Sequence, residues 1–176
     1  WNLDALELVA SMGELHSSSH VDWSEVNILT ATRLHLLQLS KLRSLTFLTV
    51  PEDDAEFKIV DCDPESERQF FEEEVRYHTA QGTFAYALRN NRAVIVGRQN
   101  SPQQIIFHSI ATRERVMGMF VGVLDEREGH VSDGTLSLLS ILLFMTANAL
   151  EHSALYWKIN EHNRNLRPGS RGGGPL

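Results

Sequence analysis

Residues 115–124 read Arg-Val-Met-Gly-Met-Phe-Val-Gly-Val-Leu, and no polar side chain follows the opening arginine. Successive residues of a strand point to opposite faces of a sheet, so this segment offers apolar side chains or glycine to both faces. Such a strand is typical of the middle of a sheet that is covered on both sides. The segment therefore predicts a sheet between two layers, and the rest of the chain must supply those layers.

Apolar residues at helical spacing predict helices, and alternating or β-branched runs predict strands, over most of the remaining chain. Five strands joined mainly by hairpins indicate an antiparallel sheet with helices on its two faces. The expected elements are helices over 2–16 and about 22–40 (capped by Asp22 or Ser24), a hairpin over 43–50 and 56–61, a helix opened by Pro64, a short helix over 83–90, strands over 93–96 and 104–112, and a helix from Ser132 to about Leu166.

Composition excludes several classes of function. The chain has 176 residues, of which 42% are hydrophobic and 22% charged, and a net charge of -7. This is ordinary for one globular domain, and the negative charge argues against nucleic-acid or anionic-lipid partners. The longest apolar run, 138–150, is too short to span a membrane, so a cytoplasmic setting is expected. The single cysteine, Cys62, is expected to be a partly buried thiol without a redox role.

Three stretches resemble the GAF family of bacterial sensory domains. Residues 81–96 are similar to its segment of glycine, short helix, polar turn and apolar strand, residues 115–124 to its central strand, and residues 131–151 to its closing helix. The resemblance covers roughly residues 22–155. The related PAS-type sensor fold is the main alternative, but the two opening helices and the Ser132-Asp133 start of the last helix favour GAF.

The resemblance implies an α+β fold: an antiparallel sheet of about five or six strands, with the N- and C-terminal helices on one face and short helices or loops on the other. It implies an N-terminal dimerisation or linker helix over 1–16, a GAF-like domain over 17–155 and an exit signalling helix over 156–166. Residues 167–176 are rich in glycine and predict a flexible tail or a cloning remnant.

The resemblance also implies a ligand pocket between the sheet and the short helices. Family members hold cyclic nucleotides, tetrapyrroles, haem, amino acids or nothing there, and this sequence names no cofactor. For each candidate an ordinary core or surface role is the simpler explanation, and His108, inside an apolar strand, is expected to be a hydrogen-bonded core residue rather than a ligand. The candidates for lining the pocket are Tyr77, His78, Phe84, Tyr86, His108, Arg113 and Met119.

Dimerisation through the first and last helices is the second implication, with a covalently attached output domain beyond the exit helix. A heptad-like apolar stripe on the last helix agrees with a homodimer. The candidates for dimer contact or relay are Leu8, Met12, Leu143, Leu150 and Trp157. The acidic run Glu72-Glu73-Glu74 is expected to be a solvated helix face.

Catalytic and metal chemistry find little support. No Gly-x-Ser-x-Gly nucleophile motif is present, and a single cysteine departs from the family's methionine-sulfoxide reductase. His16 and His20 have helical spacing, but serines separate them and no third ligand is evident. The expectation is a non-enzymatic, small-molecule-sensing regulatory domain of a bacterial signal-transduction protein. The alternative is a ligand-free dimerisation module in which Phe84, Tyr86 and Met119 pack together.

Overall fold

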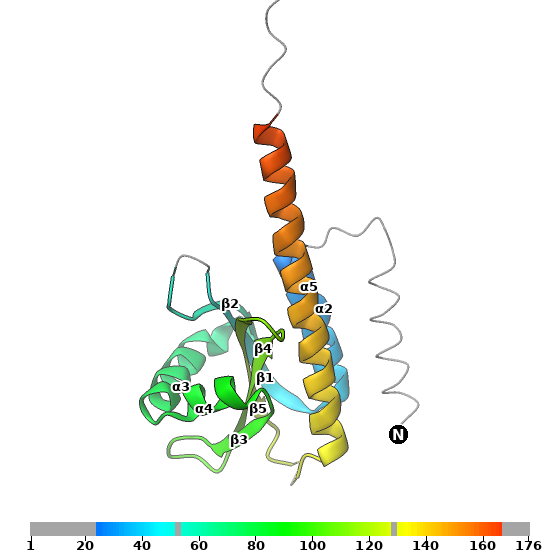
Figure 1. The fold of residues 1–176 in the computed structure, drawn as a ribbon. Coiled ribbons are helices and arrows are strands. Elements are labelled where there is room, and N and C mark those ends of the chain that lie inside the picture. Colours follow the sequence, from blue (N-terminus) through cyan, green and yellow to red (C-terminus); the bar gives the residue numbers. More distant parts are fainter. Residues whose placement is uncertain (1–23, 52–53, 128–129, 167–176) are drawn as a thin grey trace, which may run out of the picture.

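The computed structural model describes residues 24–51, 54–127 and 130–166. Its centre is a five-stranded antiparallel sheet in the order β2-β1-β5-β4-β3 (Figure 1). Ten elements follow one another: α2 (Glu25–Leu39), β1 (Leu42–Thr49), β2 (Lys58–Asp63), a 3-10 turn (Glu65–Glu67), α3 (Arg68–Ala80), α4 (Thr83–Asn90), β3 (Val94–Gly97), β4 (Gln104–Ala111), β5 (Val116–Leu124) and α5 (Asp133–Asn165).

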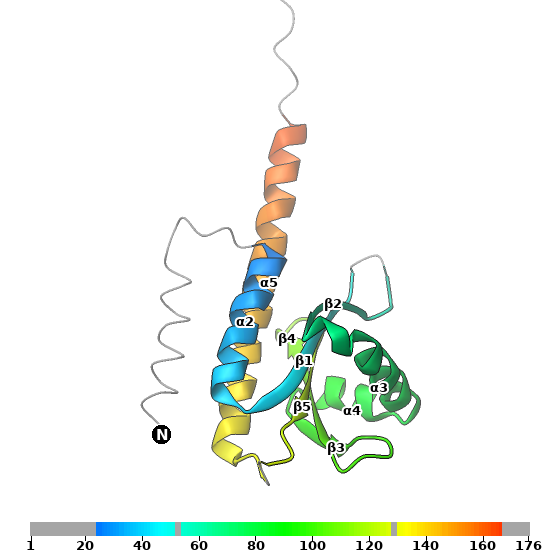
Figure 2. The same ribbon diagram turned by 180° about the vertical axis from the view of Figure 1, so that it is seen from behind.

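Two layers of helices cover the two faces of the sheet. Helices α2 and α5 lie side by side on one face, and α3 and α4 lie on the other, as the two opposite views show (Figures 1 and 2). The α+β class, the five strands and the placement of the terminal helices on one face are confirmed. The predicted helix over 2–16, including Leu8 and Met12, lies outside the described residues, as does Asp22.

The helix starts follow the signals in the sequence. Ser24 caps α2, because its side chain accepts a hydrogen bond from the Asn27 amide at 3.3 Å. Ser132 caps α5 in the same way, accepting from the Thr135 amide at 3.2 Å. Each serine satisfies an amide that has no partner inside its helix. Both helices therefore begin within a residue of the predicted capping position.

Strand β5 separates two apolar cores, as its sequence requires. Phe120 and Leu124 pack toward α2 and α5, and Met119 and Val121 pack toward α3 and α4. All four side chains are at most 5% exposed. At 25 cal/mol per Å² of apolar surface, two such cores supply most of the free energy that holds the layers together.

Helix α5 is long and apolar enough, by length and composition, to cross a membrane. The predicted absence of such a segment was based on residues 138–150 alone, whereas the helix covers 33 residues. Its inner side is buried against α2 and the sheet through Leu139, Leu143 and Leu150, among others. Packing within the domain therefore accounts for much of its apolar character.

Gly118 allows β1 and β5 to approach. A Cβ atom at this position would lie 2.1 Å from the backbone oxygen of Leu48 on the neighbouring strand. Backbone cannot yield as a flexible side chain can. We expect Gly118→Ala to lower the free energy of unfolding by about 1–3 kcal/mol or more, measured by urea denaturation.

Gly97→Ala is the matched control, because a Cβ there meets nothing within 4 Å. This substitution should change the free energy of unfolding by no more than about 0.5 kcal/mol. Equal urea midpoints for the two variants would contradict the role assigned to Gly118.

Candidate functional site

A group of buried polar side chains lies between α3 and the β3–β4 end of the sheet. Glu74 and His78 come from successive turns of α3, and their side chains are 8% and 4% exposed. The Glu74 Oε2 atom lies 3.5 Å from His78 Nε2, which is too long for a well-formed hydrogen bond. Neither Oε2 nor either ring nitrogen of His78 has a hydrogen-bond partner. Polar atoms buried without partners are costly, so they mark this group as unusual.

Arg98 and Gln103 close the group from the connection between β3 and β4. The Arg98 Nε–H donates to Glu74 Oε1 at 3.4 Å, and the Arg98 Nη1–H donates to Gln103 Oε1 at 2.6 Å. The guanidinium carbon sits 4.2 Å from the centre of the Phe70 ring. The backbone amide of Arg98 donates to the Gln103 carbonyl at 2.9 Å, so the two ends of the β3–β4 connection are joined by a hydrogen bond. We call Glu74, His78, Arg98, Gln103 and Phe70 the α3 polar cluster.

The prediction for Glu74 was wrong. The acidic run was expected to face water, and Glu72 and Glu73 do so, but Glu74 is 6% exposed. One residue advances a helix by 100°, so consecutive glutamates cannot share one face. Phe71 and His78 are buried and Val75 is half-buried, so these residues show which side of α3 is inward, and Glu74 lies on that side. This spacing was the signal in the sequence that could have identified it.

The predicted pocket residues separate into three groups. His78, Phe84 and Met119 are buried on the α3–α4 face of the sheet; the centre of the Phe107 ring lies 5.1 Å from that of His78 and 6.3 Å from that of Phe84. Tyr77 is half-buried on α3 and in edge contact with His78. Tyr86 is 44% exposed and accepts a hydrogen bond from Arg92, and Arg113 is exposed at the β4–β5 turn.

His108 lies on the opposite face of the sheet from His78. Its neighbours Phe107 and Ser109 point toward the α3–α4 side, so alternation along β4 directs His108 toward α5. Its Nδ1 atom lies 2.7 Å from the Ser109 carbonyl oxygen, which can only accept a hydrogen bond, so Nδ1–H is the donor. Nε2 is therefore the acceptor from Ser140 Oγ at 2.8 Å. His108 is a hydrogen-bonded core residue that joins the sheet to α5.

Among the depressions on the described surface are two of about 440 and 400 Å³. Arg43, Gln103, Asp125, Glu126 and Arg127 line the first, and the second lies near Val50 and Val116. Neither depression is lined by a predicted pocket residue. Phe84 and Met119 instead pack within one apolar cluster, while Tyr86 stands outside it.

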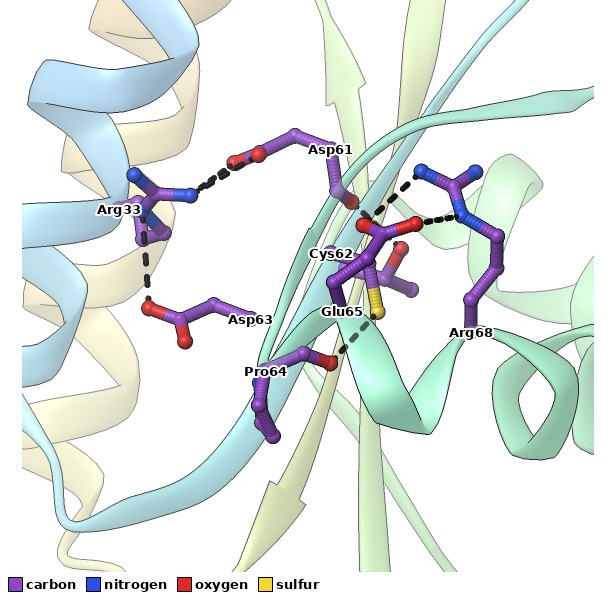
Figure 3. A network of polar contacts seen from close by, with 8 residues as sticks. Arg33, Asp61, Cys62, Asp63, Pro64, Glu65 and Arg68 are labelled. Atoms are coloured by element: carbon purple, nitrogen blue, oxygen red, sulfur yellow. Dashed lines mark hydrogen bonds and ion pairs between the residues drawn. The ribbon is translucent and has the colours of Figure 1, made fainter.

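A second polar network ties α2 to the opposite edge of the sheet (Figure 3). Arg33 of α2 donates from Nη1 to both carboxylate oxygens of Asp61, at 2.9 and 3.1 Å, and its Nε lies 3.7 Å from Asp63. Arg68, at the start of α3, is ion-paired with Glu65 and donates to the Ile59 carbonyl at 3.2 Å. Strand β2 is therefore held from both faces of the sheet.

Cys62 lies between these two arginines. The side chain is buried and its thiol donates to the Pro64 carbonyl at 3.4 Å. Burial, together with the nearby Glu65 carboxylate, raises the pKa of Cys62 to about 11. The thiolate is the reactive form of cysteine, so a raised pKa disfavours reaction of this thiol at neutral pH.

Among the residues that the structure describes, no three His, Cys, Asp or Glu side chains gather closely enough to hold a metal ion. Glu74 and His78 are only two such ligands, and the third member of their group is a cation. The α3 polar cluster therefore offers a carboxylate, an amide oxygen and a guanidinium rather than the ligand set of a metal site.

The arrangement of layers and strands has counterparts among solved structures. A scan against protein-family models found no match to the sequence, and a comparison with curated proteins also found none. Fold similarity extends to the GAF domain of an Acinetobacter phosphoenolpyruvate-protein phosphotransferase, with a TM-score of 0.61 and 15% identity, over 88% of this chain and 95% of that one. The fold is that of a GAF domain.

Two other GAF structures agree with this assignment. The GAF domain of a two-component sensor histidine kinase from Bacillus halodurans matches with a TM-score of 0.59 and 14% identity, over 77% of this chain and 99% of that one. A GAF domain/HD domain protein from Geobacter sulfurreducens matches with a TM-score of 0.59 and 14% identity, over 75% and 95%. The predicted resemblance to GAF domains is confirmed for the fold.

The buried histidines of this GAF fold make its stability depend on pH. Burial lowers the pKa of His108, His78 and His35 below 6.5, against smaller opposing effects of a hydrogen bond at His108 and of Glu74 at His78. As the pH falls below 6.5, the unfolded chain takes up protons before the folded chain does. The free energy of unfolding should therefore be constant near pH 7.5 and decrease toward pH 5.5.

Urea denaturation at pH 7.5 and 5.5 measures this decrease. His108→Gln removes one of the three histidines and keeps a side chain that can donate and accept hydrogen bonds. The variant should lose less stability between the two pH values than the wild type, even if it starts from a lower value. An identical decrease in both proteins would contradict a neutral, buried His108.

Proposed function

We propose that this GAF domain is a regulatory module of a signalling protein, which forms a homodimer through α2 and α5 and relays a signal along α5. The observation that carries this proposal is a stripe of exposed apolar side chains on the outer side of α5. It consists of Ile141, Phe144, Leu155, Ile159 and Leu166, each between 42% and 62% exposed. Advancing 100° per residue, all five fall within about 60° of one another around the helix axis.

This outer stripe differs from the predicted dimer contacts. Leu143 and Leu150 are 0% and 6% exposed and pack inside the domain against α2. Trp157 is 56% exposed but lies about 160° around the helix from Ile141. The sequence pattern contains both an inner and an outer stripe; Leu143 and Leu150 of the inner stripe are buried, whereas Trp157, farther along the same side, and the outer stripe are exposed.

A second copy of the chain fits this surface best. The stripe follows one side of a helix that is about 50 Å long at 1.5 Å per residue, and it continues past the sheet (Figure 1). Val26, Leu34 and Leu37 extend exposed apolar surface onto the neighbouring α2. Exposed apolar surface on this scale is typical of an interface, and two copies can bury the same stripe against each other.

The relay would use the connections of α5 within each protomer. His108 and Ser140 join the sheet to α5, and the Thr32 and Thr146 hydroxyls, 2.9 Å apart, join α2 to α5. A change in the sheet or in α2 would thus alter the position or rotation of α5. The helix would transmit that change to an output domain attached beyond residue 166, in a cytoplasmic protein.

Sensing of a small molecule is the second part of the proposed function. It is supported by the partnerless buried atoms of Glu74 and His78, which have unused capacity to bind a polar group. The ligand-free alternative is supported by the close packing of Phe84 and Met119 in one apolar cluster. No residue of the domain is assigned a catalytic role.

Substitution of Phe144 tests the dimer. Phe144→Glu should raise the dissociation constant of the dimer at least about 30-fold, because placing a charge at an aromatic contact of the interface costs roughly 2 kcal/mol or more. Sedimentation equilibrium over a range of protein concentrations measures the constant. Circular dichroism checks that the variant is folded.

Trp157→Glu is the matched control, because it places the same charge on the other side of the same helix. It should change the dissociation constant much less. A monomeric wild type, or a dimer that only Trp157→Glu disrupts, would show that the outer stripe is not the interface.

A further inference from the structure

We propose that the α3 polar cluster is a receptor for a guanidinium group, and that the chain's own Arg98 fills it until an external guanidinium-bearing small molecule takes its place. This inference rests on the sensory part of the proposed function and names the chemical class of its ligand. It does not depend on the homodimer.

The contacts of Arg98 are those expected of a bound guanidinium ligand. A carboxylate, a side-chain amide oxygen and an aromatic face meet the same group from Glu74, Gln103 and Phe70. Guanidinium is planar, so it can stack on a ring while its N–H groups point to acceptors at its edge. An ammonium group lacks this plane. The three partners come from α3 and from the end of the β3–β4 connection, so they form a site that the fold holds together.

The carboxylate of this site is placed for binding rather than for stability alone. Glu74 is 8% exposed, whereas its partner Arg98 is 33% exposed. A buried carboxylate is costly unless its hydrogen-bonding capacity is used. Yet Arg98 reaches only Oε1, at a long 3.4 Å, and leaves Oε2 without a hydrogen bond. A guanidinium that entered more deeply could donate to both oxygens, as bidentate pairs do.

His78 completes the inner wall of the receptor. Burial lowers its pKa, which the Glu74 carboxylate offsets only in part, so the ring is neutral at pH 7 and does not compete for the carboxylate as a cation. Its ring nitrogens are buried and without partners, and its ring packs edge-on against Phe107. A neutral imidazole offers one acceptor to an incoming N–H group.

Space for the rest of such a ligand lies beside Gln103. That residue accepts from Arg98 and also borders the 440 Å³ surface depression, together with Asp125 and Glu126. Arg43 and Arg127 line the same depression, so its charge is balanced. A flexible stem could occupy this depression while the guanidinium head displaces Arg98. The β3–β4 connection would then lose the contact that holds it to α3.

Agmatine is a suitable probe, and putrescine is its matched control, because putrescine has the same four-carbon stem with an ammonium group in place of the guanidinium. Isothermal titration calorimetry would measure the affinity of both for the wild type, for Arg98→Ala and for Arg98→Ala/Glu74→Gln. If Arg98 occupies the receptor in nine molecules out of ten, its removal should raise the affinity for agmatine about tenfold. The double variant should lose this binding.

Displacement can be observed in the wild type without any substitution. On addition of agmatine, the Arg98 Nε–Hε resonance in 15N-labelled protein should move toward the position of free arginine. Arg98→Gln replaces Arg98→Ala if the latter does not fold. Binding of agmatine to the variant with no shift in the wild type would overturn displacement.

Other outcomes would overturn the receptor itself. These are equal affinity for putrescine, equal affinity in the wild type and Arg98→Ala, unchanged binding in the double variant, or no binding to Arg98→Ala. A failure of this kind would leave the dimer unaffected, because sedimentation measures the dimer independently. A monomeric protein that binds agmatine as described would overturn the homodimer and keep the receptor.

Discussion

Strand β5 has no face that can be left in water, and the rest of the molecule follows from this constraint. Met119 and Phe120 are both completely buried although they point to opposite sides of the sheet. Both sides therefore need a layer of helices, and β1 and β4 must flank the strand so that its backbone is paired. Most polar side chains are left for the outer helix surfaces, the ends of the sheet and its edge strands, and the buried ones need partners. Of the two polar networks, the one around Arg33 lies at the β2 edge of the sheet, and the α3 polar cluster lies beside β3 and β4.

The two helical layers differ in how completely their buried polar groups are satisfied. On the α2–α5 side, His108 uses both ring nitrogens, and the Thr32 and Thr146 hydroxyls pair with each other, whereas His35 Nδ1 is the buried side-chain atom of α2 without a partner. On the α3–α4 side, Glu74 and His78 keep partnerless atoms. Satisfied networks make packing rigid, whereas unsatisfied ones store free energy that a ligand can release. This difference favours α3 and α4 as the layer that responds and α5 as the layer that transmits.

The sequence predicted the elements well because their signals are local: capping serines, Pro64, Gly82 before α4, and the alternation of the strands. It predicted the site less well, because the side of a strand or helix that becomes buried depends on long-range packing. Along β4, one step of the strand separates Phe107 from His108 and places them on opposite sides of the sheet. Along α5, Leu143 and Phe144 are adjacent and both apolar, yet the first is buried and the second is 42% exposed. Which of the two side chains is buried depends on where α2 and the sheet pack against α5.

Helix α3 is the element that can connect the two polar networks. Its first residue, Arg68, is bonded to the Ile59 carbonyl of β2, and its later turns carry Glu74 and His78 beside Phe107 of β4. Strand β2 in turn meets α2 through Arg33 and Asp61, which are each 24% exposed (Figure 3). This ion pair is largely buried and makes two hydrogen bonds, so a displacement of β2 would be passed on to α2. A shift of α3 toward a ligand could therefore move β2 and α2 without breaking either apolar core. These polar contacts at the sheet edge would let a local binding event reach α5, because the cores themselves resist deformation.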